Sequence, residues 1–184
     1  RLDENQGRGA ACNAGVREGS GRYIYILDVD CILRKENILF SHMETISGAQ
    51  VSASCGGIYR NGDSFWAKYQ NDVAQRRVTS FECGDKSSLT TANFMIKREA
   101  FESVKGFDSG FTQYGFEDKD LLLRLIKDGC EMQYCDMANV EHMCDLSMIS
   151  VVNKTMKSAA FSSTLFIKKH PDEYKDMPYA KADV

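Results

Sequence analysis

This sequence of 184 residues lacks the features that mark several large classes of protein. No apolar run approaches the length of a membrane span, and the polar opening RLDENQGRG does not have the pattern of a secretory signal. A net charge of −3 gives no electrostatic footprint for nucleic acid, and no Walker sequence or GxSxG nucleophile elbow is present. We therefore expect a globular protein with no transmembrane segment and no nucleic-acid partner.

The seven cysteines are scattered and form no CxxC pair, so the sequence does not predict a structural zinc site. An odd number of cysteines without a disulfide pattern is most simply explained by free thiols in a reducing compartment. This favours a cytoplasmic location, with peripheral attachment to a membrane left open. Gly7 and Gly9 do not form a dinucleotide fingerprint, because no apolar strand precedes them and their spacing is wrong.

The composition, 43% hydrophobic and 27% charged, fits a folded globular chain. Apolar runs and alternation predict strands at 23–27, 50–60, 78–81, 91–96, 131–135 and 139–142. Helical spacing predicts helices at 10–17, 36–46, 98–104, 117–127 and, with one interruption, 147–169, whereas 64–77 is ambiguous. Mixed elements with strands typical of parallel sheets predict the α/β class. The polar tail after Pro171 is expected to be poorly ordered.

The stretch from Tyr23 to Asp30, YIYILDVD, combines an apolar strand with two carboxylates, Asp28 and Asp30. Buried parallel strands read as continuous apolar runs, and their C-terminal ends open onto ligand crevices in α/β folds. Two acids at such an end suit a hard divalent cation that carries a phosphate-bearing ligand. The alternative is a strand that runs into an Asp-rich turn, and the strand and acids alone do not decide between the two.

A second acidic cluster, Glu117, Asp118 and Asp120, stands at the start of a clear amphipathic helix. Acids in a first helical turn commonly do no more than favour the helix dipole and cap free N–H groups. Here the Gly- and aromatic-rich segment GFDSGFTQYGF leads directly into them. Such a loop can shape a pocket around a ring-shaped substrate, and a carboxylate at its edge can serve as a general base toward a hydroxyl.

His142 follows an extended segment and is the histidine that we assign to a metal site. A lone histidine is more often structural than a ligand, but imidazole and carboxylate together suit manganese. His142 could therefore complete a site begun by the Asp pair. His42, within a helical pattern, and His170, near the tail, receive no role. Trp66 could stack on a sugar or a base, although core packing is the more common fate of such a residue.

Taken in order, these segments resemble the family 2 glycosyltransferases, which have the nucleotide-diphospho-sugar transferase (GT-A) fold. ENQGRGAACNAGVREGSGRYIYILDVD resembles the family's Asn-x-Gly segment and small-residue helix that lead into the DXD strand. TTANFMIKREAFESVKGFDSGFTQYGFEDKDLLLRLIKDG resembles its acceptor-side block. The resemblance implies a mixed, mostly parallel sheet flanked by helices. It also implies a catalytic domain at 1–146, followed by a C-terminal helix and polar tail at 147–184.

The resemblance implies roles on the donor side. Asp30 would bind Mn²⁺ or Mg²⁺ at the donor diphosphate, with His142 as a further metal ligand. Asp28 would contact the ribose or sugar of the donor. Asn5 and Gly7 belong to the donor-binding Asn-x-Gly segment. The donor would be a nucleotide-diphospho-sugar, most simply a UDP-sugar.

The resemblance also implies roles on the acceptor side. Asp118 would be the general base, and Glu117 would help to hold the acceptor. Retaining relatives that initiate mucin-type glycans carry Asp-x-His in place of Asp-Val-Asp, so inversion is the favoured stereochemistry. The acceptor would be a glycan or a lipid-linked sugar, as expected for polysaccharide biosynthesis.

The family's domain begins with a strand–helix–strand unit whose loops bind the nucleotide base, and that unit should precede Asn5. Such a unit takes roughly 30 residues or more. Four residues precede Asn5 here, so the resemblance implies an N-terminally truncated domain. The missing strands would leave an open sheet edge, which makes a homodimer an expectation. Two other functions stay open. One is a catalytically incomplete domain that serves as a carbohydrate-binding or assembly module, and the other is a sugar-nucleotide pyrophosphorylase, against which the Glu-Asp block argues.

Overall fold

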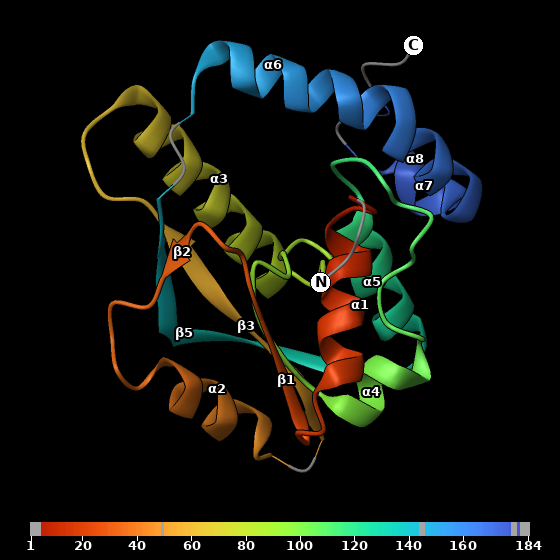
Figure 1. The fold of residues 1–184 in the computed structure, drawn as a ribbon. Helices are drawn as coiled ribbons and strands as arrows, with labels where there is room; N and C mark the ends of the chain where they lie inside the picture. The colour runs from red at the N-terminus through yellow and green to blue at the C-terminus, as the bar shows by residue number, and fades with distance from the viewer. Residues whose placement is uncertain (1–4, 49, 144–145, 178–179, 181–184) are drawn as a thin grey trace.

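The computed structural model describes residues 5–48, 50–143, 146–177 and 180. It shows a five-stranded mixed sheet with helices packed on both faces (Figure 1), which confirms the α/β class. The strands are β1 (Tyr23–Leu27), β2 (Cys31–Ile32), β3 (Val51–Tyr59), β4 (Asn93–Lys97) and β5 (Glu131–His142). The helices are α1 (Arg8–Glu18), α2 (Ile38–Ile46), α3 (Phe65–Glu82), α4 (Arg98–Ser103), α5 (Glu117–Lys127), α6 (Met148–Lys157), the π-helix η1 (Ser158–Ser162), α7 (Ser163–Lys169) and α8 (Pro171–Lys175).

The strand order is β1–β4–β3–β5–β2, and β3 and β5 are parallel neighbours. The other three pairings of the described sheet are antiparallel, so the expectation of a mostly parallel sheet is wrong. The apolar run of β1 has another cause. Ile24 and Ile26 enter the core on one face, while Tyr25 packs against His42 of α2 on the other. A strand covered on both faces is apolar throughout, whichever way its neighbour runs.

The main core lies between one face of the sheet and the helices α3, α4 and α5. Leu121 and Leu125 of α5 pack there against Phe94 of β4, and all three side chains are fully buried. The opposite face is covered by α2, whose Ile38 packs against Val140 of β5. The predicted α5 is amphipathic because these leucines recur at helical spacing. The helix therefore presents Glu117 and its neighbours at one end of a fixed sheet.

A buried hydrogen-bond network joins four strands to α2. Asn93 of β4 accepts hydrogen bonds at Oδ1 from the Tyr25 hydroxyl at 2.8 Å and from His42 Nε2 at 3.0 Å. Its Nδ2 donates to the carbonyls of Gly57 at 3.1 Å and Ala138 at 2.6 Å. Burial lowers the pKa of His42, so its ring is neutral. His42, one of the two histidines that received no role, is thus a satisfied core residue, which helps to fix the register of the sheet.

The expectation of a short strand at 78–81 is wrong, because this stretch is the last turn of α3. The ambiguous segment before it is helical as well. Ser64 begins the helix as its N-cap, since its hydroxyl accepts a hydrogen bond from the Ala67 N–H at 3.1 Å. Phe81, in the last turn of the same helix, has a buried side chain. A short apolar run is compatible with either element, and here the cap and the tertiary contact select the helix.

The expectation of a poorly ordered tail after Pro171 is wrong for residues 171–177. Pro171 occupies the first turn of α8, where its missing N–H has no helical partner to lose. The tail is anchored in a third cluster of buried side chains: Phe111, Leu123, Phe166, Tyr174 and Met177. The C-terminal helices α7 and α8 therefore pack against α5 and the loop before it. The division between 1–146 and 147–184 stays a prediction, and 178–179 and 181–184 lie outside the described residues.

Two further expectations concern surfaces and thiols. Within the described part of the chain, no helix combines the length and the apolarity needed to cross a membrane. The six described cysteines are free, and Cys144 lies outside the described residues. The strands β1 and β2 form the edges of the described sheet, and edge strands leave backbone groups without a sheet partner. A homodimer formed through such an edge stays a prediction.

We expect any larger residue in place of Gly56 to destabilise the fold, because Gly56 lies at an irregularity in the β3–β5 pairing. A Cβ at this position would overlap Asn93 Nδ2 and the Ala138 carbonyl. We expect Gly56→Ala to lower the free energy of unfolding by about 3 kcal/mol, measured by urea denaturation. The control is Gly15→Ala in α1, where no atom lies within 4 Å of the added Cβ; this change should be neutral or stabilise by roughly 1 kcal/mol. Equal effects of the two variants would contradict the expectation.

Candidate active site

Arg8, the first residue of α1, joins the two acidic clusters of the sequence. Its Nε donates to Asp28 Oδ1 at 2.8 Å, and its Nη1 donates to Asp118 Oδ1 at 2.6 Å. Nη1 also donates to Thr91 Oγ1 at 3.0 Å, and Nη2 donates to the Thr91 carbonyl at 3.1 Å. One guanidinium therefore fixes the end of β1, the start of α5 and the segment before β4 in one place.

The charges of this cluster remain open to solvent on one side. The side chains of Asp28 and Asp118 are 30% and 27% exposed. Burial opposes the charge on Arg8, but Asp118 and Asp28 hold the pKa of the guanidinium above its ordinary value. Burial also raises the pKa of Asp28, and Arg8 acts against that rise. The cluster thus places two carboxylates around one permanent cation, within reach of a bound molecule.

Glu117 is the unsatisfied acid of the second cluster. It is half-buried, and its Oε2 is buried without a hydrogen-bond partner in the described part of the chain. Burial, and after it the neighbouring Asp118, raise the pKa of Glu117. An unpartnered buried carboxylate oxygen is costly, so such a group in a folded protein calls for an explanation. A hydroxyl of a bound ligand would supply the missing donor.

The backbone at the junction between the aromatic loop and α5 sets the direction of the acidic side chains in the first turn of α5. Phe116 precedes the helix with φ = 68°, in the left-handed region that bulky residues rarely adopt. Its ring lies 4.8 Å from the ring of Phe166 in α7, centroid to centroid. Gly115, with φ = 100°, adds a second unusual turn. The aromatic contact holds the strained turn, and the turn sets the direction in which Glu117 and Asp118 leave the helix.

The two aspartates of the turn after β1 contact different partners. Asp28 lies against Arg8, whereas Asp30 Oδ2 lies 3.3 Å from His142 Nε2. Val29 between them is fully exposed. The Asp30 carbonyl accepts a hydrogen bond from the Met143 N–H at 2.7 Å, which ties the turn to the end of β5. The structure thus brings together Asp30 and His142, the two residues predicted to share a metal.

A third side chain with a metal-ligating atom completes this cluster. Cys31 is paired across the β2–β5 ladder with His142. Its sulfur, a carboxylate oxygen of Asp30 and a ring nitrogen of His142 all lie within 4.8 Å of one another. Burial, and after it Asp28 and Asp30, raise the pKa of Cys31 to about 12, so the free thiol is protonated. Carboxylate, imidazole and sulfur are all established ligands of divalent metals, so these residues fit a metal ion.

Asn5 and Gly7 lie at the beginning of α1, immediately before Arg8. The side-chain oxygen of Asn5 accepts a hydrogen bond from the Gly7 N–H at 3.0 Å. Gly7 has φ = 89°, and a Cβ there would lie 2.9 Å from the Phe111 carbonyl. The described contacts of this pair therefore explain the shape of the turn that delivers Arg8. Donor binding by Asn5 and Gly7 stays a prediction.

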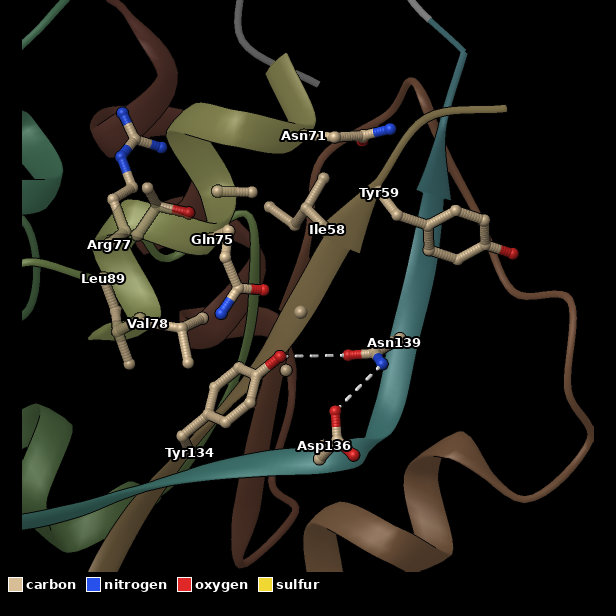
Figure 2. Close-up of a pocket in the computed structure, with 14 residues that line it drawn as sticks. Ile58, Tyr59, Asn71, Gln75, Arg77, Val78, Leu89, Tyr134, Asp136 and Asn139 are labelled. Atoms are coloured by element: carbon tan, nitrogen blue, oxygen red, sulfur yellow. Dashed lines mark hydrogen bonds between the residues drawn. The ribbon is translucent and has the colours of Figure 1, made fainter. Parts of the chain in front are cut away.

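A cavity of about 240 Å³ opens between α3, the end of β3 and β5 (Figure 2). Its polar lining includes Gln75, Thr90, Tyr134 and Asn139. The Tyr134 hydroxyl lies 3.3 Å from Asn139 Oδ1 as a hydrogen-bond donor. Thr90 is the neighbour of Thr91, whose hydroxyl donates to Asp118 Oδ1. The cavity thus offers amides, hydroxyls and the rings of Tyr59 and Tyr134, and Thr90 links it along the chain to the site of the acids.

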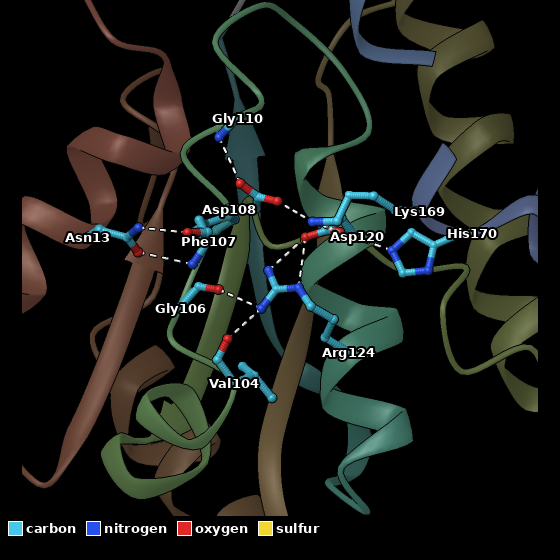
Figure 3. A network of polar contacts seen from close by, with 10 residues as sticks. All are labelled: Asn13, Val104, Gly106, Phe107, Asp108, Gly110, Asp120, Arg124, Lys169 and His170. Carbon is cyan, nitrogen blue, oxygen red and sulfur yellow. Dashed lines mark hydrogen bonds and ion pairs between the residues drawn. The ribbon is translucent and has the colours of Figure 1, made fainter. Parts of the chain in front are cut away.

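Asp120, two residues after Asp118, is fully buried, and side chains of α5 and of the C-terminal helices hold its carboxylate (Figure 3). Arg124 donates to its Oδ2 from Nε at 2.8 Å and from Nη2 at 2.7 Å. His170 Nε2 lies 2.9 Å from Oδ1, and Lys169 Nζ lies 3.2 Å from the same oxygen. Burial would raise the pKa of Asp120, but hydrogen bonds from Arg124 and His170 hold it below its ordinary value. This acid is therefore an ionised anchor for α7.

The same network holds the loop that leads to α5. Arg124 Nη1 donates to the carbonyls of Val104 at 2.6 Å and Gly106 at 2.8 Å (Figure 3). From the other side, Asn13 of α1 exchanges two hydrogen bonds with the Phe107 backbone, at 2.8 and 3.0 Å. The loop is thus fixed to α1 and α5 at once, and α1 is the helix that carries Arg8.

Sequence reasoning missed three side chains of the site: Arg8, Thr91 and Cys31. The one available signal for Arg8 was its position at the start of a helix in the QGRG segment. Cys31 directly follows the DVD acids, which could have drawn attention to it. Nothing near Thr91 in the sequence marks it, because its partner Asp118 is distant along the chain.

Comparison with known proteins finds two matching families and a similar solved structure. The family described as "Glycosyl transferase family 2" matches residues 1–105, and that described as "N-terminal domain of galactosyltransferase" matches residues 77–147. Among solved structures, a mannosyltransferase of Pyrobaculum calidifontis in complex with GDP-Man and Mn²⁺ is similar, with a TM-score of 0.61 and 17% identity. The similarity covers 92% of this chain and 45% of the mannosyltransferase, so this chain spans less than half of that protein's length. No match was found among curated proteins.

The structural likeness, at this low identity, shows the GT-A fold and leaves the substrates of the chain open. The family match is the stronger finding, because it covers more than half of the sequence and includes the DVD strand and the residues of α4. The chain belongs to glycosyltransferase family 2.

Proposed function

We propose that this chain carries the reaction centre of a glycosyltransferase that moves a sugar from a nucleotide-diphospho-sugar to an acceptor hydroxyl, with inversion. The observation that supports this most is the bridge made by Arg8 between Asp28 and Asp118. A single displacement needs the acceptor hydroxyl and its general base close to the donor, on the face of the anomeric carbon opposite the departing diphosphate. The bridge holds a donor-side acid and the candidate base around one guanidinium.

On the donor side, Asp30 and His142 would hold Mn²⁺ or Mg²⁺. Such an ion, when bound, neutralises charge that develops on the departing nucleotide diphosphate. The similar mannosyltransferase was solved with GDP-Man and Mn²⁺, which supports a nucleotide-sugar donor and a divalent metal. A UDP-sugar remains the prediction from sequence. Asp28, held by Arg8, would face the ribose or the sugar.

On the acceptor side, Asp118 would remove the proton of the attacking hydroxyl. In the described structure the hydrogen bonds of its side chain, from Arg8 and Thr91, both fall on Oδ1. Oδ2 is therefore the oxygen that is left for the acceptor proton. Two donors on Oδ1 hold the carboxylate in one orientation, which is the requirement for a general base. The unpartnered Oε2 of Glu117 would accept a second hydroxyl of the acceptor.

The cavity lined in part by Thr90 would hold the part of the acceptor that lies further from the reaction. Its amides and its two tyrosines offer hydrogen bonds and an apolar face to a sugar ring. A glycan acceptor, free or linked to a lipid, fits this lining. The domain assignment 1–146 as the catalytic unit, with 147–184 as an appended segment, forms part of the same proposal.

Asp118→Asn tests the general base. The amide keeps the shape of the side chain but cannot accept a proton, so turnover should fall about 100-fold or more. Thermal stability and the binding of nucleotide diphosphate with Mn²⁺, measured by calorimetry, should change little. Asp128→Asn, at the exposed far end of α5, is the matched control and should retain turnover. If Asp118→Asn still turns over within a few-fold of the unaltered chain, the assignment of the base is wrong.

Glu117→Gln tests whether this acid is kept for ligand binding at a cost in stability. Because the pKa of Glu117 is raised in the folded chain, the folded state holds its proton to higher pH than the unfolded state. Stability is therefore lost as pH rises from the ordinary value, about 4.3, through the raised pKa. We expect Glu117→Gln to be more stable than the unaltered chain at pH 7, with the difference vanishing near pH 4.

The measurement for this variant is urea denaturation across that pH range, together with the acceptor KM. The acceptor KM should rise while stability at pH 7 increases, a pair of changes that a purely structural residue would not give. Glu131→Gln, an exposed acid at the start of β5, is the control and should alter neither quantity. A loss of stability at pH 7 in Glu117→Gln would contradict the expectation.

Gln75→Ala tests the cavity as part of the acceptor site. Gln75 is exposed and lines the cavity, so its loss should not disturb folding. Removal of one neutral hydrogen bond costs about 1 kcal/mol, so the acceptor KM should rise about fivefold with the donor KM unchanged. Lys68→Ala, an exposed change elsewhere on α3, serves as the control. An unchanged acceptor KM would place the acceptor elsewhere.

A further inference from the structure

The geometry points to Cys31 as a third metal ligand, which gives the Asp30–His142 site a preference for a soft divalent ion such as Zn²⁺. The inference rests on the proposed function in one respect: the same site would serve the donor diphosphate with Mn²⁺ or Mg²⁺. It goes beyond that function because it assigns a role to Cys31 and makes the site sensitive to a competing metal.

The position of Cys31 follows from the strand pairing. Directly opposed residues of an antiparallel ladder project to the same face with their Cβ atoms about 5 Å apart. Cys31 and His142 are such a pair in β2 and β5. Asp30 reaches the same point from the turn before β2, where its carboxylate lies 3.3 Å from His142 Nε2. Two consecutive residues of one segment and the facing residue of β5 thus supply three different ligand types.

The spacing of the ligand atoms suits a tetrahedral ion. The sulfur, oxygen and nitrogen atoms lie within 4.8 Å of one another. A zinc ion with ligand bonds of about 2.0 to 2.3 Å holds such atoms roughly 3.5 Å apart, so side-chain adjustment is enough to close the site. Three protein ligands with a fourth position open is the pattern of catalytic zinc sites. Cys31 is buried, so its sulfur is shielded from competing reactions.

The thiol of Cys31 determines which metal ion binds more tightly at this site. Sulfur favours zinc over manganese and magnesium, whereas carboxylate favours the harder ions, and affinity for a mixed site rises from Mn²⁺ to Zn²⁺. Binding releases the thiol proton of Cys31 to solvent, because the thiolate is the ligand. A Zn²⁺ ion held by three side chains has fewer positions left for diphosphate oxygens than an ion that prefers six ligands. Zinc at this site would therefore displace the hard ion and oppose donor binding.

A cobalt titration of the full chain tests the assignment. Co²⁺ bound to a thiolate gives a sulfur-to-metal charge-transfer band in the near ultraviolet, which a site of oxygen and nitrogen does not give. We expect the band to saturate at one equivalent of Co²⁺ and to disappear when Zn²⁺ is added. Cys31→Ser should lose the band, and its affinity for Zn²⁺ should fall about 100-fold or more. Cys83→Ser, at an exposed cysteine, should keep both properties.

A measurement without any variant guards against misfolding of Cys31→Ser. X-ray absorption at the zinc edge of the unaltered chain should show one sulfur at about 2.3 Å. A coordination shell of nitrogen and oxygen alone, or a cobalt band that persists in Cys31→Ser, would overturn the inference. Failure of the proposed function is seen separately, as absence of sugar transfer by the unaltered chain with Mn²⁺. The cobalt spectrum is independent of that outcome.

Discussion

The buried carboxylate of Asp120 is the interaction on which the arrangement of the site depends. A fully buried charge is stable only when it is paired and hydrogen-bonded, and removal of one partner from such a pair typically costs about 3 to 5 kcal/mol. Arg124, Lys169 and His170 meet this requirement from α5, from the end of α7 and from the residue after it. Because all of them must converge on one carboxylate, α5 has a single orientation relative to the C-terminal helices. Asp118, two residues earlier on the same helix, inherits that orientation.

Helical geometry alone places the acids in the first turn of α5 in two different surroundings. Residues two apart on an α-helix point to nearly opposite sides, so Asp120 enters the interior while Asp118 faces Arg8 and solvent. The simple explanation, that these acids only complement the helix dipole, accounts for their presence near an N-terminus. It does not account for the unpartnered Oε2 of Glu117, which raises the free energy of the folded state. That cost makes sense if a ligand supplies the partner.

The sequence pattern predicted helices and strands that are defined by neighbouring residues. It failed for features that depend on residues far apart in the sequence. The strand at 23–27 and the helix at 117–127 have the predicted bounds, since apolar periodicity and a clear stop define them. The sequence did not predict whether neighbouring strands run parallel or antiparallel. An apolar run shows that a strand is covered on both faces, but it does not depend on the direction of the neighbouring strand. Arg8 was missed for a similar reason. Its three partners lie on other elements, and only folding brings a guanidinium to both acidic clusters.

The charge balance of the site gives a physical reason for a divalent cation. Around Arg8, one positive charge faces Asp28 and Asp118, and Asp30 adds a further carboxylate on the other side of the turn. A nucleotide diphosphate would bring more negative charge to this partly buried region, where interactions between charges are stronger than in water. Arg8 cannot offset that charge, because its guanidinium is already engaged by both aspartates and by Thr91. We propose that such a donor binds together with a cation from outside the chain, which Asp30 and His142 would hold, where it would neutralise both the carboxylate and the diphosphate.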